Sequence, residues 1–163
     1  MQWFTAPSSS INVPAISLLG LPPIYGTVYL LFSYLSAHSS GWHYLAQRFP
    51  ATAQVPGYRR FGAITCVMGG SRYQKHVTFS PYPEGLWIMM PWLNCFTHPT
   101  LFIPWNQVSP IVKKTAPLGL FASYKFHLGD GPKSVAVTIY LAELADLMEA
   151  KRCSAAQTPS VLL

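Results

Sequence analysis

The chain has 163 residues, of which 50% are hydrophobic and only 10% are charged, whereas about 25% charged residues is typical of soluble globular chains. Eleven lysines and arginines against five aspartates and glutamates give a net charge of +6. This length allows one domain of ordinary size with an appendage, and the shortage of charge indicates that part of the chain contacts something other than water.

The N-terminal part of the chain predicts a membrane helix. Residues 2–47 include no Lys, Arg, Asp or Glu. We expect an N-terminal arm over residues 1–14 and a single transmembrane helix over residues 15–38, because about 20 apolar residues span the hydrocarbon core. Pro22 and Pro23 remove backbone donors, so the regular helix is expected to begin near Pro23. A fully buried helix of a soluble protein is the alternative. A cleaved signal peptide is not expected, because the arm lacks basic residues.

Basic residues on one side of this helix predict its orientation. Arg48, Arg59 and Arg60 all follow the helix. The positive-inside bias then places the C-terminal part of the chain in the cytoplasm, behind a single pass through the inner (cytoplasmic) membrane.

Aromatic side chains along the helix predict a partner for it. Tyr25, Tyr29 and Phe32 lie within the apolar stretch, whereas aromatic belts sit at the two membrane interfaces. A buried phenol needs a hydrogen-bond partner, so we predict that these three residues contact another protein subunit or a cofactor. The alternative is that Tyr25 and Tyr34 are simply the two belts.

A linker with a short helix, over residues 39–56, is expected next. Ser39 or Ser40 can cap this helix, and its apolar residues recur at helical spacing before Pro50 ends it; they are Trp42, Leu45, Ala46 and Phe49. Residues 51–57 are polar and turn-rich, and mark the domain boundary.

The rest of the chain, residues 57–152, predicts a mainly β domain that ends in a helix, with a tail over residues 153–163. Alternating apolar residues and turn signals predict strands over residues 59–67, 73–79, 86–90, 101–105, 108–114, 120–128 and 134–139. Pro110 places the fifth strand at an edge of the sheet. From Tyr140 to Arg152 the period changes to that of an amphipathic helix.

The alternation also predicts which side chains face the core. In the first strand these are Phe61, Ala63, Thr65 and Val67; in the second, Tyr73, Lys75, Val77 and Phe79; in the sixth, Leu120, Ala122, Tyr124, Phe126 and Leu128; in the seventh, Val135, Val137 and Ile139. On the helix they are Leu141, Leu144, Leu147 and Met148.

Seven strands followed by one helix is the order of a pleckstrin-homology-like (PH-like) barrel. Two motifs carry a more specific resemblance. Gly85-Leu86, His98-Pro99, Leu101, Ile103-Pro104-Trp105 and Val108 resemble a signature of GRAM and bacterial PH-like domains. Ser40-Gly41-Trp42, Leu45-Ala46 and Arg48-Phe49-Pro50 are similar to a stub in small bacterial proteins with an N-terminal membrane helix. The resemblance covers about residues 40–150 and implies a scaffold that binds lipids, peptides or proteins.

Residues that could support catalysis or bind a cofactor are scarce, so we expect neither an enzyme nor a metal or cofactor site. Cys95 and His98 lie three residues apart, but no second pair lies nearby. Cys66, Cys95 and Cys153 are irregularly spaced and are expected to be free thiols in a reducing compartment. Glu84 and Asp130 are the only acids before the helix of this domain, which argues against paired-carboxylate chemistry. Patterns typical of nucleic-acid-binding domains are absent from the sequence.

Two functional hypotheses remain. In the first, the chain is a non-catalytic accessory subunit of a membrane complex, with photosynthetic and respiratory assemblies as candidate hosts, and partner contacts also come from Trp92, Phe96 and Phe102. In the second, it is a stand-alone adaptor that binds anionic lipid headgroups through Arg59, Arg60, Arg72 and Lys75. The alternative is that these basic residues have no ligand and are solvated side chains on strand edges, where they discourage aggregation.

Overall fold

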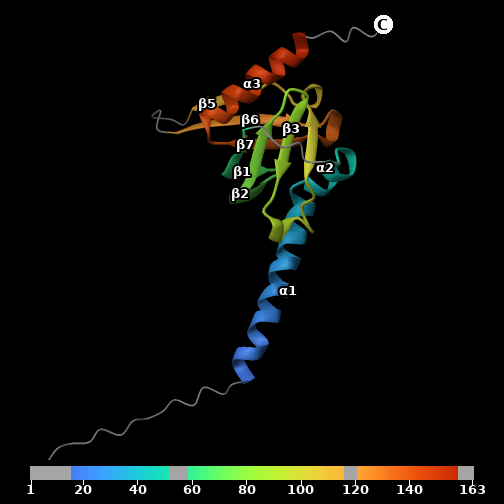
Figure 1. The fold of residues 1–163 in the computed structure, drawn as a ribbon, viewed down its shortest axis with the longest axis vertical. Coiled ribbons are helices and arrows are strands. Elements are labelled where there is room, and N and C mark those ends of the chain that lie inside the picture. The colour runs from blue at the N-terminus through green and yellow to red at the C-terminus, as the bar shows by residue number, and fades with distance from the viewer. Residues whose placement is uncertain (1–15, 52–58, 116–120, 158–163) are drawn as a thin grey trace, which may run out of the picture.

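The protein is described by a computed structural model over residues 16–51, 59–115 and 121–157, with only the helical backbone for residues 16–23. Figure 1 shows a long helix leading into a curled sheet that a C-terminal helix covers. The helices are α1 (Ile16–Ser39), α2 (Trp42–Arg48) and α3 (Ala142–Gln157), with short 3₁₀ helices η1 (Trp92–Asn94), η2 (Trp105–Gln107) and η3 (Gly131–Lys133). The strands are β1 (Phe61–Met68), β2 (Ser71–Pro81), β3 (Gly85–Met89), β4 (Leu101–Pro104), β5 (Val112–Thr115), β6 (Ala122–Leu128) and β7 (Val135–Ile139).

The seven strands form one antiparallel sheet in the order β4-β3-β2-β1-β7-β6-β5. Its inner face holds the core, and Leu144, Ala145 and Met148 of α3 join this core. Seven strands and a C-terminal helix confirm the predicted mainly β arrangement and its order of elements. The outer edge of β4 is covered, because the Phe102 N–H donates to the Phe49 carbonyl and the Ala51 N–H to that of Thr100.

The predicted core faces are confirmed where alternation is regular and wrong where a bulge interrupts it. In β6 and β7, Tyr124, Phe126, Leu128, Val135, Val137 and Ile139 are buried as expected, whereas Leu120 lies outside the described residues. In β1 the register shifts on both sides of Ile64, and Ala63 has a φ of 54°. The extra residue rotates the strand, so that Cys66 and Met68 face the core in place of Thr65 and Val67.

The second strand deviates in the same way. Tyr73, Val77 and Phe79 are buried as predicted, but Lys75 is exposed with a φ of 54°. Its N–H donates to the Thr65 hydroxyl across the bulge. The positive φ turns this side chain away from the core face.

The fifth strand is shorter than predicted, because β5 begins only at Val112 and Val108 forms just an isolated bridge with Leu128. Pro110 lacks a backbone donor and precedes the strand. The C-terminal helix is longer than predicted, because α3 continues to Gln157, five residues past its predicted end at Arg152.

The N-terminal helix begins at Ile16, before Pro22 and Pro23, and not near Pro23 as predicted. Across the described residues, no helix combines the length and the apolar character needed to cross a membrane. The predicted transmembrane span is therefore not supported. The predicted arm over residues 1–14, and most of the linker over residues 51–57, lie outside the described residues.

The end of α1 is fixed to the sheet at a glycine turn. Gly69 has a φ of +53°, its N–H donates to the Ala136 carbonyl, and a Cβ at this position would overlap the carbonyl group of Ser40. Gly70 has a φ of +92° but nothing within 4 Å of its own Cβ position. Both neighbours therefore have a positive φ, but only Gly69 has atoms close to its Cβ position.

We predict that Gly69→Ala lowers the free energy of unfolding by about 3 kcal/mol, since a steric overlap adds to the left-handed strain. Gly70→Ala is the matched control and should cost about 1 kcal/mol, from strain alone. Urea denaturation followed by tryptophan fluorescence measures both. Equal losses would show that α1 does not press on this turn.

Candidate functional site

Small side chains near the end of α1 and in the turn after it face the sheet. Ser33, Ala37 and Ser40 recur at intervals of four and three residues and are buried, with Ser33 only 9% exposed. Ser36 lies on the same side and is half-buried. Residues at these spacings share one face of a helix, so the inward face of α1 is a stripe of serines and one alanine.

Side-chain hydrogen bonds join this stripe to the loop after β3. The Tyr29 hydroxyl donates to Asn94 Oδ1 at 2.6 Å. One turn further along α1, the Ser33 and Thr97 hydroxyl oxygens lie 2.7 Å apart. Asn94 ends η1 and Thr97 follows it closely, so the η1 loop runs beside α1. These bonds hold the loop against the helix.

A buried cluster around His98 continues the junction inward. His98 is 2% exposed; its Nε2 lies 3.1 Å from the Tyr73 hydroxyl and its Nδ1 lies 2.9 Å from the Thr97 hydroxyl. Tyr73 in turn donates to Ser40 Oγ at 2.8 Å. Trp42 packs edge-on against the imidazole, with ring centroids 5.1 Å apart, and donates its indole N–H to the Pro99 carbonyl. Buried polar groups are tolerated because each has a partner.

Burial sets the protonation of this cluster. Removal from water lowers the pKa of His98 to about 4, because a charged imidazolium is poorly solvated there. The same effect raises the pKa of Tyr73 above its ordinary value, with its bonds to Ser36 and Ser40 opposing the rise. Both groups are therefore neutral at neutral pH, and the cluster is a structural network of uncharged donors and acceptors.

The outward face of α1 is apolar, which is the reverse of a helix that packs on a soluble domain. Phe32 is 75% exposed, and the exposed large side chains surround the rest of the helix; they are Ile24, Tyr25, Val28, Tyr29, Leu30, Leu31, Tyr34 and Leu35. The η1 loop adds Trp92 at 78% exposed, Phe96 at 82% and Leu93. We call these residues together the α1–η1 apolar surface.

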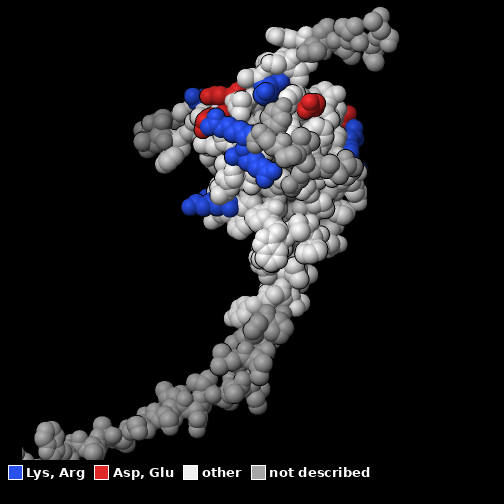
Figure 2. All heavy atoms as spheres, in the orientation of Figure 1, with Lys and Arg blue, Asp and Glu red and all other residues white. Residues whose placement is uncertain are grey.

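This surface carries no charged side chain, since neither residues 24–47 nor residues 85–112 include Lys, Arg, Asp or Glu. Figure 2 shows the consequence in one view, in which the blue and red groups lie over the sheet and α3 and none lies on the described part of α1. Two uncharged stretches that are far apart in the sequence thus meet at one end of the molecule.

The structure brings together most of the residues predicted to bind a partner. Tyr25, Tyr29, Phe32, Trp92 and Phe96 all belong to the α1–η1 apolar surface. Phe102 does not join them, because it is half-buried with its ring centroid 5.3 Å from that of Trp87.

The four bases predicted to bind headgroups do not form one cluster. Arg59 pairs with Glu143 at the start of α3 and lies over the Phe61 ring. Arg72 is opposite Val67, toward the other end of the β1–β2 pair, about 20 Å away along the strands. Lys75 lies between these ends, and Arg60 is exposed beside Arg59. Only Arg72 adjoins α1, where it lines a groove of about 420 Å³ with Phe32 and Leu35.

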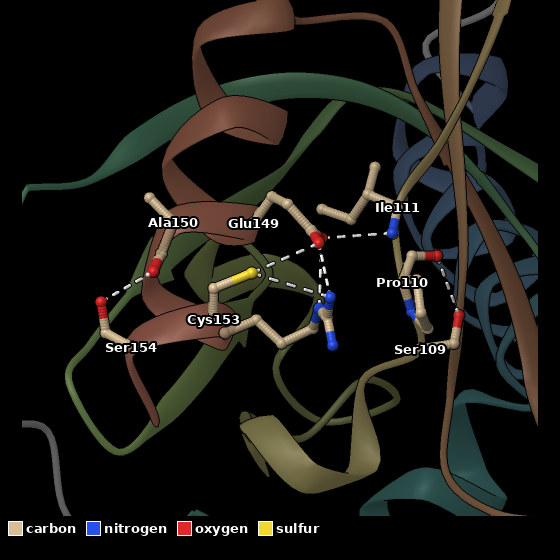
Figure 3. Close-up of polar contacts among 8 residues, drawn as sticks. Ser109, Pro110, Ile111, Glu149, Ala150, Cys153 and Ser154 are labelled. Atoms are coloured by element: carbon tan, nitrogen blue, oxygen red, sulfur yellow. Dashed lines mark hydrogen bonds and ion pairs between the residues drawn. The ribbon is translucent and has the colours of Figure 1, made fainter. Parts of the chain in front are cut away.

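Another polar cluster fastens α3 to the loop before β5 (Figure 3). Arg152 donates to Glu149 Oε2 at 3.1 Å and to its Oε1 at 2.5 Å, and the Ile111 N–H donates to Glu149 Oε2 at 3.3 Å. The bond from Arg152 lowers the pKa of Glu149. A cavity of about 680 Å³ lies beside it, between η2 and the end of α3. Because Arg152 is already neutralised by Glu149, this cluster acts as a structural tie.

A second exposed apolar set lies at the other end of the sheet. Strand β7 begins at the α1–α2 corner, where Val135 lies against Gly41, and ends at Ile139. Exposed Tyr140 follows directly, and exposed Val112 and Phe121 lie in and beside the neighbouring strands β5 and β6. We call Val112, Phe121 and Tyr140 the β5–β7 patch.

Within the described ranges, no three His, Cys, Asp or Glu side chains lie close enough to hold a metal ion. Cys66, Cys95 and Cys153 are free thiols, of which only Cys66 is buried, and burial raises its pKa to about 12. A thiol with such a high pKa is a poor nucleophile. The polar groups of the described sites are thus engaged in holding the fold.

No motif in the sequence indicated Ser33, Asn94 and Thr97, which join α1 to the η1 loop. The signal was present in part, because Tyr29, Ser33, Ser36 and Ser40 form a hydroxyl stripe at helical spacing inside an apolar stretch. Such a stripe predicts a polar contact but does not identify its partner.

Comparison with known proteins adds a limited fold likeness. No protein-family model and no curated protein sequence matches this chain. Among solved structures, the Vps36 N-terminal PH domain is similar with a TM-score of 0.48 and 8% identity, over 68% of this chain and 94% of that chain. A likeness of this size says nothing about ligands or partners.

The low pKa of His98 predicts a pH dependence of stability. An unfolded imidazole binds a proton near pH 6.5, but the folded one binds it only near pH 4. The free energy of unfolding should therefore be unaffected by His98 above pH 6.5 and fall as the pH drops toward 4, by about 3 kcal/mol in all.

Urea titrations between pH 4.5 and 8 measure this loss in the natural chain and in His98→Gln. The glutamine variant should be less stable at pH 8 and should lose less stability on acidification. Parallel pH profiles for the two proteins would contradict the buried neutral imidazole.

Proposed function

We propose that this chain is a non-catalytic accessory protein of a membrane complex, in which α1 embeds in the membrane and the PH-like domain docks on a partner at the membrane surface. The observation that carries the proposal is the inverted polarity of α1. In the part of α1 whose side chains are described, Ser33 and Ser36 face the domain and the large apolar side chains face outward.

The energetics of this inversion favour an apolar surrounding. Burying a Leu, Val or Phe side chain stabilises by roughly 1.5–3 kcal/mol, and α1 leaves many of these exposed. A helix that is apolar around most of its circumference belongs in a membrane or in the core of a large assembly. In such surroundings, polar side chains turn toward their own protein, as Ser33 and Ser36 do.

The positions of the basic residues support a cytoplasmic domain at the inner membrane. Arg48, Arg59 and Arg60 all follow α1 in the sequence. The positive-inside bias then favours the cytoplasmic side for the sheet.

The β5–β7 patch supports a protein partner for the domain. It lies away from α1, so membrane attachment leaves it exposed to water. Large exposed apolar side chains are typical of protein–protein contact sites. Lys114, opposite Ser123, and Lys125, opposite Val112, lie among the residues of the patch, which suits a partner surface that carries both acidic and apolar side chains.

The alternative function, a stand-alone adaptor for anionic headgroups, has less support. It needs several bases in one place, whereas Arg59 and Arg72 lie at opposite ends of the β1–β2 pair. Arg59 is also paired with Glu143.

Membrane attachment predicts the effect of a charge on α1. Leu31 is exposed on its outward face, so Leu31→Glu should leave the domain folded and lower the membrane partition coefficient roughly 100-fold, the cost of placing a charge in hydrocarbon. Leu31→Ala is the control and should remain bound. Co-sedimentation with vesicles measures both, and an unchanged bound fraction for Leu31→Glu would contradict membrane attachment.

Partner docking predicts that changes in the β5–β7 patch abolish partner binding without affecting membrane binding. Phe121→Ser combined with Tyr140→Ser should remove stoichiometric partners from a pull-down in mild detergent, because it removes the apolar centre of the patch. Lys133→Ser, at exposed η3, is the control. The double variant should still co-sediment with membranes. Retention of every partner would remove the β5–β7 patch as the docking site.

A further inference from the structure

The loop after β3 exposes aromatic side chains that the sheet does not need. Trp92 and Phe96 are more than three-quarters exposed, and Leu93 is half exposed. No core contact of the domain depends on them, whereas the residues between and after them, Asn94 and His98, are buried. The loop thus separates its side chains into a buried polar set and an exposed apolar set.

Hydrogen bonds fix this loop at a defined height along α1. Asn94 pairs with Tyr29, and Thr97 with Ser33. Tyr29 and Ser33 lie ten and six residues before Ser39, the last residue of the helix, which corresponds to about 15 and 9 Å along the axis. The loop therefore extends beyond the end of the sheet and follows α1 outward.

We propose that the η1 loop inserts into the lipid bilayer beside α1, with Trp92, Leu93 and Phe96 as the inserted side chains. This inference rests on the proposed membrane attachment of α1 and extends it to a second element, contributed by the β domain. In this proposal, lipid covers both parts of the α1–η1 apolar surface, the helix and the loop.

Continuity and charge argue for lipid as the occupant. The exposed face of the loop continues the outward face of α1, and neither residues 85–112 nor residues 24–47 contain a charged residue. Arg72 of β2 is the base that borders this face, beside Phe32 and Leu35. Trp92 combines an apolar ring with an N–H donor, a chemistry suited to the membrane interface. The loop also covers the Tyr29 and Ser33 hydroxyls, which would be costly to expose to hydrocarbon.

The chain offers its own reporter and its own control. Cys95 is exposed between Asn94 and Phe96, Cys153 is exposed on α3, and Cys66 is buried. An environment-sensitive fluorophore is attached to Cys95 in the full-length Cys153→Ser variant, and to Cys153 in the full-length Cys95→Ser variant. Each protein is reconstituted with phosphatidylcholine vesicles that carry nitroxides on their acyl chains.

We expect the probe at Cys95 to shift its emission to the blue and to lose intensity to the acyl-chain nitroxides, while the probe at Cys153 does neither. Phe96→Glu should return the Cys95 probe to water while the chain still co-sediments. A chain that co-sediments with its Cys95 probe exposed to aqueous iodide would overturn loop insertion but leave the attachment of α1 intact.

Two other outcomes separate the remaining explanations. If the chain does not co-sediment at all, the proposed function fails and loop insertion fails with it. If the Cys95 probe is shielded in native membranes but is neither shielded nor quenched in vesicles, a protein covers the loop, and lipid is overturned as the occupant.

Discussion

The structure depends on the contact between the hydroxyl stripe of α1 and the β domain. A helix of this composition has no large apolar face to bury on the sheet, because its large side chains point outward. Tyr29, Ser33 and Ser36 instead meet Asn94, Thr97 and Tyr73 through hydrogen bonds. Each such bond stabilises only by about 1 kcal/mol in water, but polar bonds of this kind remain satisfied when the helix is surrounded by lipid.

The same contact explains why the junction is built around an uncharged histidine. His98 links the Tyr73 and Thr97 hydroxyls and packs against Trp42, so one side chain connects β2, the η1 loop and α2. A network in surroundings of low dielectric constant is stable only if every member is satisfied. A charged group here would need its own counter-ion, and the described residues near it supply none.

Regular alternation made much of the fold predictable. In β6 and β7 the core residues follow from the period alone, since burial on one face imposes it. In α3 the period identifies Leu144 and Met148 but misses buried Ala145. In β1 and β2, Ala63 and Lys75 adopt positive φ values that no local signal marks, because neither residue is a glycine. The bulge depends on how the two strands pair. Pairing involves both strands, so it could not be predicted from the sequence of either strand alone.

The candidate site shows the same division. The composition of the two uncharged stretches predicted that Tyr29, Phe32, Trp92 and Phe96 contact a partner, and all four are exposed. The sequence could not predict that these residues lie side by side. Tyr29 and Asn94 are 65 residues apart, and the Tyr29 hydroxyl and the Asn94 amide could each have bonded to another residue. The structure adds the hydrogen bonds between Tyr29 and Asn94 and between Ser33 and Thr97. These bonds explain why an apolar loop of the β domain lies beside an apolar helix. The same hydrogen bonds thereby fix the orientation of α1 relative to the β domain.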